Sequence, residues 1–146
     1  EEQLQKSLFT SGQLYKYSVA SNILSLSLTL PASPRVAGLQ AFRWFLRSEF
    51  SEENLAFWLA CQDYRNTPEP KRATKALNIY SRFINSDAPQ EVNLDGQTRE
   101  ALLGSQDEAA ADVFDSAQQR IFTLMAKDSF PRFLRSSHCR DLLRAL

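Results

Sequence analysis

Residues 45–61 read FLRSEFSEENLAFWLAC, two strongly apolar runs joined by a short polar turn. Ser51 is a residue type that caps helix N-termini, and Glu52 and Glu53 follow it where the helix macrodipole favours acids. Upstream of the turn, apolar residues of Val36–Leu46 recur at helical spacing. The stretch therefore predicts two consecutive helices. The second helix is apolar nearly all round, which places it at the centre of the domain.

The chain downstream of this pair continues in helices separated by short breaks. Helical spacing over residues 72–85 predicts that Ala76, Tyr80, Phe83 and Ile84 are buried. Further helices are expected over Asp95–Leu103 and 112–127, after a cap at Ser129, and from a cap at Ser136 or Ser137 through Leu143. The predicted fold class is therefore all-α, an irregular bundle of about seven to nine short helices.

Residues 1–34 differ in composition from the rest of the chain. They carry only four charged side chains and are rich in Ser, Thr and Leu. Ser or Thr alternates with Leu over Ser25–Leu30, a strand-like period of two, and a loop is expected over Ala32–Arg35. We therefore divide the chain into a divergent N-terminal segment, 1–34, and a helical domain, 35–146.

Length and composition exclude several classes of function. A chain of 146 residues fits one domain with a sizeable core. The 17 basic and 17 acidic side chains give zero net charge, so the basic excess typical of nucleic-acid binders is missing. Two Cys and one His cannot form a disulfide framework or a common metal site. We expect no metal, no cofactor and no nucleic acid, which favours a binding module over an enzyme.

The residue pattern contains no combination of side chains that indicates a catalytic site. His138 and Cys139 are adjacent, whereas a nucleophile and its base must face each other, so we expect an exposed turn histidine. Glu52 and Glu53 diverge by about 100° on a helix and form no acid–base pair. The four glycines are scattered and form no phosphate-binding loop. No catalytic residue is predicted.

Targeting signals are not evident in the sequence. The chain opens on Glu1-Glu2 instead of a positive region followed by a long apolar run. The most apolar early stretch, Ile23–Leu30, is too short and too rich in Ser and Thr to span a bilayer. No anchor motif closes the C-terminus. We expect a cytoplasmic protein.

Three polar clusters interrupt the apolar pattern, at residues 49–54, 91–95 and 128–132. Helix capping accounts for Ser51, Asp95 and Ser129. Capping does not account for Asn54 or Asn93. It also leaves unexplained the i, i+4 spacing in the third cluster, which lets its Asp and Arg pair and hold each other's rotamer. These clusters are the candidate functional surface.

At these clusters the sequence strongly resembles the RGS family, the regulators of G-protein signalling. The matching segments occur in the family's order and lie within residues 45–61, 79–84, 88–100, 114–118 and 124–136. The segments are most similar to the small members that act on inhibitory and Gq-type α subunits. The N-terminal segment departs from the family, because it has no Trp and does not resemble the usual first helix pair.

The resemblance implies an all-helical monomer that binds the GTP-bound α subunit of a heterotrimeric G protein (Gα) and accelerates its GTP hydrolysis. Such a domain is not itself an enzyme, because Gα already carries its arginine in cis and a glutamine that orients the attacking water. The domain instead binds the Gα switch regions best in their transition-state conformation. The implied location is the inner face of the plasma membrane, with peripheral association.

The resemblance also implies which residues contact Gα. They are Glu49, Phe50, Ser51, Glu53, Asn54, Asn93, Leu124, Asp128, Ser129 and Arg132. In this assignment Asn93 reaches towards the Gα glutamine, and Asp128 faces switch I while Arg132 orients it. Glu49 and Glu53 add further acidic groups around that arginine.

Two alternatives to this reading stay open. A domain of the same fold can be a scaffold without activator function, which the retained Asn54, Asn93 and Asp128–Arg132 pair disfavour. The chain could also fail to fold without a regular first helix pair. Within the family reading, Phe57 and Trp58 are expected in the core. Cys61 matches a position that is palmitoylated in some relatives, but a cysteine in an apolar helix is more often buried and unmodified.

Overall fold

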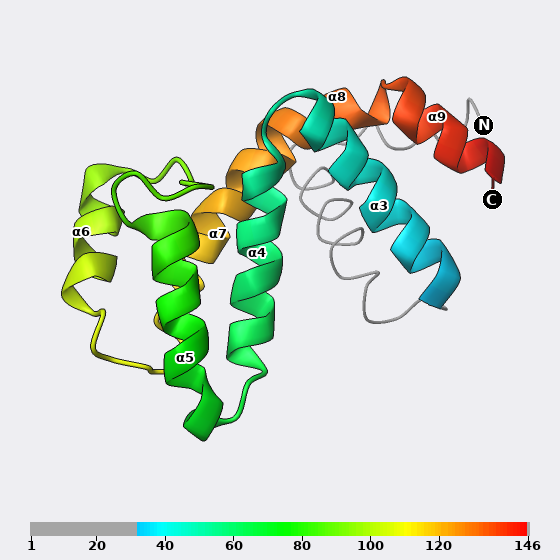
Figure 1. Cartoon of the computed structure of the whole chain (residues 1–146). Coiled ribbons are helices and arrows are strands. Elements are labelled where there is room, and N and C mark those ends of the chain that lie inside the picture. Colours follow the sequence, from blue (N-terminus) through cyan, green and yellow to red (C-terminus); the bar gives the residue numbers. More distant parts are fainter. Residues whose placement is uncertain (1–31, 146) are drawn as a thin grey trace. The chain divides into compact units, whose positions relative to one another are not determined.

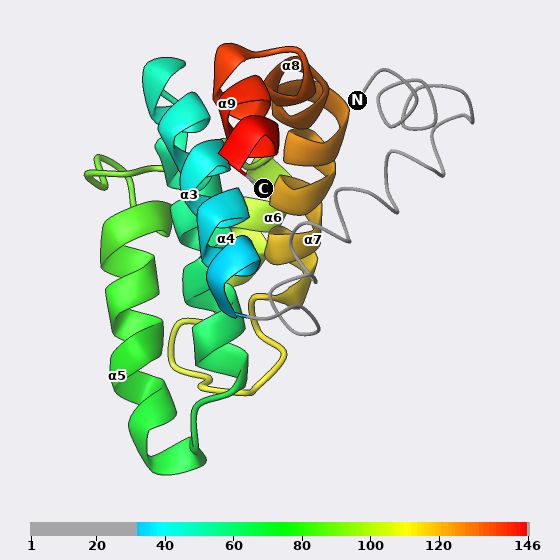
Figure 2. The ribbon, with the colours of Figure 1, turned by 90° about the vertical axis from the view of Figure 1, so that its right-hand side faces the viewer.

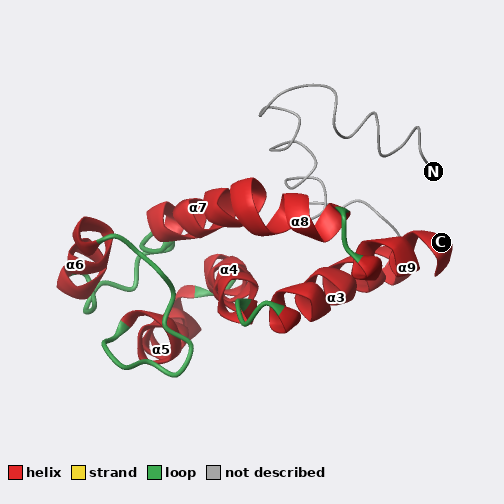
Figure 3. Cartoon of the chain, turned by 90° about the horizontal axis from the view of Figure 1, so that it is seen from above, coloured by secondary structure: helices red, strands yellow, loops and turns green. Residues whose placement is uncertain are grey.

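The computed structural model describes residues 32–145, and the regular structure in that range is helical (Figure 1, Figure 3). The predicted all-α class is confirmed there. The helices are α3 (Ala32–Ser48), α4 (Glu52–Arg65), α5 (Glu69–Ile79), α6 (Gly96–Gly104), α7 (Asp115–Leu124), α8 (Phe130–Leu134) and α9 (Ser137–Ala145). Two π-helical turns accompany them, η1 (Tyr80–Ile84) and η2 (Met125–Ser129). The strand-like alternation expected over residues 25–30 lies outside the described range.

The chain divides into two compact units. The described part of unit 1 comprises residues 32–52 and 123–145, and unit 2 comprises residues 53–122. The boundaries fall within α4 and α7. Unit 1 therefore contains α3, η2, α8 and α9, and unit 2 contains most of α4 with α5, η1, α6 and most of α7.

The core of unit 1 is a cluster of aromatic rings from α3 and α8. Phe42 contacts Phe130 and Phe133, with ring centroids 5.6 and 5.2 Å apart. Phe45 contacts Phe133 at 5.6 Å. Helix α3 also packs along α9 (Figure 2). Phe42 and Phe45 are three residues apart on α3, and Phe130 and Phe133 are three apart on α8. Burial of these four rings joins segments far apart in the chain.

The core of unit 2 is a second aromatic cluster, built from α4, η1 and the segment before α7. Phe57 is fully buried and contacts Phe83 at 5.5 Å. Phe114 lies between Tyr64 and Tyr80, at 4.9 and 5.3 Å. The buried tyrosines keep polar partners, since the Tyr80 hydroxyl donates to the Leu102 carbonyl at 2.6 Å. Burial of Ala76, Tyr80, Phe83 and Ile84 was predicted and is confirmed.

A buried amide joins α7 to α4 inside unit 2. Gln118 Nε2 donates to the Trp58 carbonyl at 3.1 Å and to Gln62 Oε1 at 2.9 Å. Its Oε1 accepts a hydrogen bond from Arg65 at 3.3 Å. Because both ends of the amide are satisfied, Gln118 can be buried without the cost of an unpaired polar group.

Two of the predicted helix ends are wrong, and one is confirmed. The expected loop over Ala32–Arg35 is the first turn of α3, where a proline is tolerated because first-turn N–H groups have no intrahelical acceptor. Ser129 is not a cap, since its backbone is helical (φ −65°, ψ −42°) and the chain continues from η2 into α8. The cap at Ser136 is confirmed, because its hydroxyl accepts the Cys139 N–H at 3.3 Å.

Two burial expectations also need correction. Helix α4 is not buried all round: Phe57 lies in the core, but Trp58 is only half-buried and Leu59 is 37% exposed. Its buried residues, Asn54, Leu55, Phe57, Cys61 and Tyr64, recur at helical spacing on one side, so some apolar residues of α4 lie outside the buried face. His138 does not lie in an exposed turn, because it belongs to α9 and its ring lies 6.0 Å from that of Phe45.

Candidate functional site

The end of α3 carries an unusual aromatic residue. The Ser51 N–H donates to the Leu46 carbonyl at 2.9 Å, and the Phe50 N–H donates to the Arg47 carbonyl at 3.2 Å. These two bonds form a Schellman motif, in which the residue after the helix adopts a left-handed conformation and is usually glycine. Here Phe50 occupies that position, with φ 57°.

The conformation of Phe50 is costly and its ring is exposed. A left-handed backbone costs a residue with a Cβ about 1–2 kcal/mol. The side chain gains no compensating burial, since Phe50 is 94% exposed. Strained backbones that present an apolar side chain to solvent concentrate at functional sites. The end of α3 is therefore a candidate contact surface.

Next in unit 1 is an ion-pair cluster centred on Arg132. Its Nε donates to both carboxylate oxygens of Glu49, at 3.1 and 2.9 Å, across a sequence separation of 83 residues. Its Nη1 donates to Asp128, one helical turn earlier. Hydrogen bonds that Arg132 donates to the Glu49 and Asp128 carboxylates hold the pKa of its guanidinium above the usual range. The predicted Asp128–Arg132 pair is confirmed, and we call these three residues the Arg132 clamp.

The remaining predicted residues of unit 1 differ in how far they are exposed to solvent. The Ser51 hydroxyl donates to the Leu46 carbonyl at 3.4 Å and so supports the end of α3. Leu124 is 36% exposed. Ser129 is buried, with 3% of its surface exposed. Leu124 is thus available to a partner, whereas Ser129 is a supporting residue.

The predicted residues of unit 2 are Glu53, Asn54 and Asn93. Asn54 is buried (7% exposed), and its Oδ1 has no hydrogen-bond partner. A buried acceptor without a partner is costly, so this atom is a candidate for a bond from a bound molecule. Glu53 is half-buried, and Asn93 is exposed between buried Val92 and Leu94.

The loop that carries Asn93 is tied to α6 by Arg99, a residue that the sequence pattern did not single out. Arg99 donates to the carbonyls of Ile84 and Val92. A signal was present in the sequence, because a cation in the first turns of a helix opposes the macrodipole and so needs other partners. Asp95 sits at the predicted N-cap position of that helix. A hydrogen bond from Thr98, aided by the charge of Arg120, lowers the pKa of the Asp95 carboxyl.

Both cysteines are buried. Burial raises the pKa of the Cys61 thiol above its usual range, and the negative charge of Asp115 adds to the shift. The predicted burial of Cys61 is confirmed. A thiol with a raised pKa is a poor nucleophile at neutral pH. Among residues 32–145, no three His, Cys, Asp or Glu side chains gather as a metal site would require.

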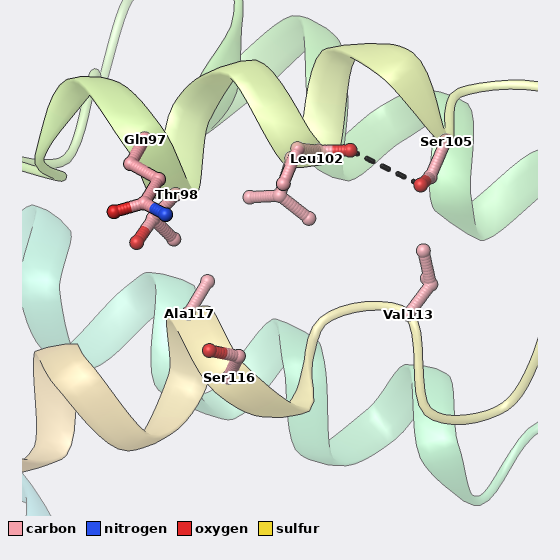
Figure 4. A pocket seen from close by; sticks show the side chains of 8 residues that line it. Gln97, Thr98, Leu102, Ser105, Val113, Ser116 and Ala117 are labelled. Atoms are coloured by element: carbon pink, nitrogen blue, oxygen red, sulfur yellow. Dashed lines mark hydrogen bonds between the residues drawn. The ribbon is translucent and has the colours of Figure 1, made fainter.

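A cavity of about 320 Å³ lies between α6 and α7 in unit 2 (Figure 4). Its lining residues are Gln97, Thr98, Ala101, Leu102, Ser105, Val113, Ser116 and Ala117. Every one of these side chains is uncharged, and none is a cysteine or histidine that could act as a nucleophile or base. The lining therefore lacks the convergent charged groups of a catalytic site.

Within the described part of the chain, none of the helices combines the length and the apolar character that crossing a bilayer requires.

Comparisons with known proteins cover most of the chain. Residues 32–142 match the family described as Regulator of G protein signaling domain. Regulator of G-protein signaling 21 of Homo sapiens is 53% identical over 110 residues, which are 75% of this chain and 72% of that protein. Regulator of G-protein signaling 5 of Sus scrofa is 50% identical over 108 residues, 73% of this chain and 60% of that protein. Regulator of G-protein signaling 8 of Rattus norvegicus is 51% identical over 107 residues, and the chain spans 59% of its length.

Proposed function

The chain belongs to the regulator of G-protein signaling domain family, and from this premise we propose that it accelerates GTP hydrolysis by heterotrimeric Gα subunits and so terminates signalling. The relatives named above are regulators of G-protein signaling by their names. The proposed partner is GTP-bound Gα of the inhibitory or Gq type. The domain acts as a monomer in the cytoplasm, at the inner face of the plasma membrane with peripheral association.

The proposed mechanism leaves the chemistry to the partner. Gα supplies the arginine that stabilises transition-state charge and the glutamine that orients the attacking water. This chain contributes a surface that binds the switch regions more tightly in their transition-state conformation than in the ground state. Only such differential binding lowers the barrier, because a surface that bound both states equally would leave the rate unchanged.

The observation that carries the proposal is the Arg132 clamp. Arg132 joins Glu49 and Asp128 through charge-assisted hydrogen bonds. Such bonds are stronger and more directional than neutral ones. The Asp128 carboxylate is 60% exposed and keeps acceptor capacity beyond its bond to Arg132. In the proposal it accepts hydrogen bonds from switch I, with little rotamer entropy left to lose on binding.

Other residues supply apolar contact and polar specificity. The Phe50 ring and the Leu124 side chain are exposed and suit apolar contacts. The unpaired Asn54 Oδ1 is an acceptor for a switch N–H, and the exposed Asn93 amide reaches towards the Gα glutamine. Ser51, Glu53 and buried Ser129 complete the proposed surface from supporting positions.

The direct test is single-turnover GTP hydrolysis by purified inhibitory-type Gα, with and without the full chain. We expect acceleration of about tenfold or more, which corresponds to about 1.4 kcal/mol of differential binding. Asn54→Ala and Asn93→Ala should weaken the acceleration and leave helicity by circular dichroism unchanged. A folded chain that leaves the Gα rate unchanged contradicts the proposal. If the chain binds the GDP form and the GDP–aluminium fluoride form of Gα with equal affinity, it is a scaffold and not an activator.

A second prediction separates the effect of Phe50 on protein stability from its effect on the acceleration of hydrolysis. Phe50→Gly should raise the free energy of unfolding by about 0.5–1 kcal/mol, because relief of the left-handed backbone exceeds the entropy that glycine adds to the unfolded chain. The same change should lower acceleration on the order of tenfold, as loss of an aromatic contact does. Urea unfolding and single-turnover hydrolysis measure the two effects.

The matched control for that prediction is Phe50→Ala. It removes the same ring but keeps a Cβ on the left-handed backbone. We therefore expect the same loss of acceleration without a gain in stability. Equal stabilities of the Gly and Ala variants would contradict the strain argument, and full acceleration by both would contradict the contact.

A further inference from the structure

Asn93 stands at the centre of a tight turn. The Leu94 N–H donates to the Val92 carbonyl at 3.1 Å, an i to i+2 bond that defines a γ-turn. Val92 and Leu94 are buried, at 1% and 7% exposure, so the two residues that flank Asn93 are fixed in the core of unit 2. The Val92 N–H donates to the Phe83 carbonyl at 3.0 Å and ties the turn to η1.

A single guanidinium closes this turn from the side of α6. Arg99 Nη2 donates to the Val92 carbonyl at 2.8 Å, and Nη1 donates to the Ile84 carbonyl at the end of η1. The Val92 carbonyl thus accepts two hydrogen bonds, one from the turn and one from Arg99. Since that carbonyl belongs to the peptide bond that leads into Asn93, Arg99 fixes the peptide plane from which Asn93 projects.

The chemistry of this bridge requires arginine. The planar guanidinium presents donors in a fixed fork and can reach two carbonyls at once, whereas an ammonium group is a point charge on a flexible stem. The Glu91 carboxylate lies 3.3 Å from Nη1 and balances the charge, and the Arg99 side chain is only 19% exposed. Arg99 holds this place although a cation in the first turns of α6 opposes the macrodipole.

We propose that Arg99 is a positioning residue, which holds the Asn93 backbone so that its side-chain amide meets the partner in one orientation. This role rests on the proposed function for the identity of the partner. It predicts that loss of the fork loosens Asn93 while the core of unit 2 persists, because Val92 and Leu94 stay buried.

The first test needs no partner. By 15N relaxation, the Asn93 amide of the unmodified chain should be rigid, with an order parameter of about 0.85, and Arg99→Lys should lower it towards about 0.6. Arg82→Ala is the matched control: Arg82 donates to Gln90 Oε1 at 2.5 Å and lies over the Phe83 ring at 4.8 Å, so its removal leaves the bonds to the Val92 carbonyl in place and Asn93 should stay rigid. In the unmodified chain the Arg99 Nη protons should exchange slowly, which tests the fork even if the variant does not fold. Unchanged order at Asn93 in Arg99→Lys, or rapidly averaged Nη signals, overturns the proposal.

The second test uses Gα and separates positioning from general stability. Arg99→Lys should lower the acceleration of single-turnover hydrolysis on the order of tenfold, since small misplacements of contact groups are costly. In an Asn93→Ala background the same change should have no further effect, because the residue that Arg99 positions is absent. An equal loss in both backgrounds overturns the proposal. If the unmodified chain does not accelerate hydrolysis, the proposed function fails, and the relaxation measurement still decides the role of Arg99.

Discussion

Arg132→Ala is expected to lower the acceleration of GTP hydrolysis on the order of a hundredfold, the loss that follows when contact groups shift by about an ångström. The substitution removes the bonds to Glu49 and Asp128 together. Both carboxylates then rotate freely and repel each other, so the surface presented to the partner loses its geometry. Single-turnover hydrolysis with a fixed excess of the chain measures the effect.

Stability should change little in the same variant. Arg132 and Asp128 are 44% and 60% exposed, and exposed ion pairs contribute about 1 kcal/mol or less. Circular dichroism and urea unfolding should therefore be close to those of the unmodified chain. A large loss of stability would show that the clamp is part of the core instead of a preorganised contact.

Two further variants test the geometry of the clamp. Arg132→Lys keeps the charge but loses the planar fork, so it should recover only a small part of the acceleration. Arg135→Ala is the matched control, because Arg135 is an exposed arginine one turn away whose side chain donates, among the described residues, to the Pro131 carbonyl. Full acceleration by Arg132→Ala, or an equal loss in Arg135→Ala, would contradict the role given to the clamp.

The second large effect is expected in the core of unit 1. Phe42→Ala should lower the free energy of unfolding by about 3–5 kcal/mol, the usual cost of truncating a buried phenylalanine. Phe42 is 1% exposed, and its ring contacts both Phe130 and Phe133. Its removal leaves a cavity between α3 and α8 that these rigid rings cannot fill. Urea unfolding followed by circular dichroism measures the change.

Trp44→Ala is the matched control on the same helix. Trp44 is larger than Phe42, but it is 51% exposed and contacts Arg47 through a cation–π interaction. Such a contact contributes about 0.5–1 kcal/mol at an exposed site. We therefore expect a loss below about 1 kcal/mol. If the two substitutions cost the same, burial on α3 is not what stabilises unit 1.

Local patterns predicted the helices well where one face of a segment meets the core. Phe42, Phe45 and Leu46 on α3, and Ala76, Tyr80, Phe83 and Ile84 over α5 and η1, are buried as helical spacing indicates. The wrong predictions concern where helices end and how much of a helix surface is buried. Ser129 has the chemistry of a cap, but packing of α8 in unit 1 continues the helical backbone through it. Leu59 has the hydropathy of a core residue, but it lies outside the buried face of α4 and is 37% exposed.

The candidate site shows the same division. The Asp128–Arg132 pair was predictable, because four residues on a helix bring two side chains together whatever the rest of the chain does. The bond from Arg132 to Glu49 spans 83 residues and depends on how α3 packs against α8. The left-handed backbone of Phe50 runs against its residue type, so no propensity indicates it.

The sequence by itself determined the helical class, the family and which residues are candidates, because helix periodicity, capping chemistry and motif order are properties of neighbours in the chain. Tertiary structure alone decided which candidates are exposed, which are buried and which are held. Phe50 projects into solvent, Ser129 is covered, and Arg132 and Arg99 each join segments distant in sequence. Those outcomes depend on packing and on hydrogen bonds between elements, which form only when the chain has folded.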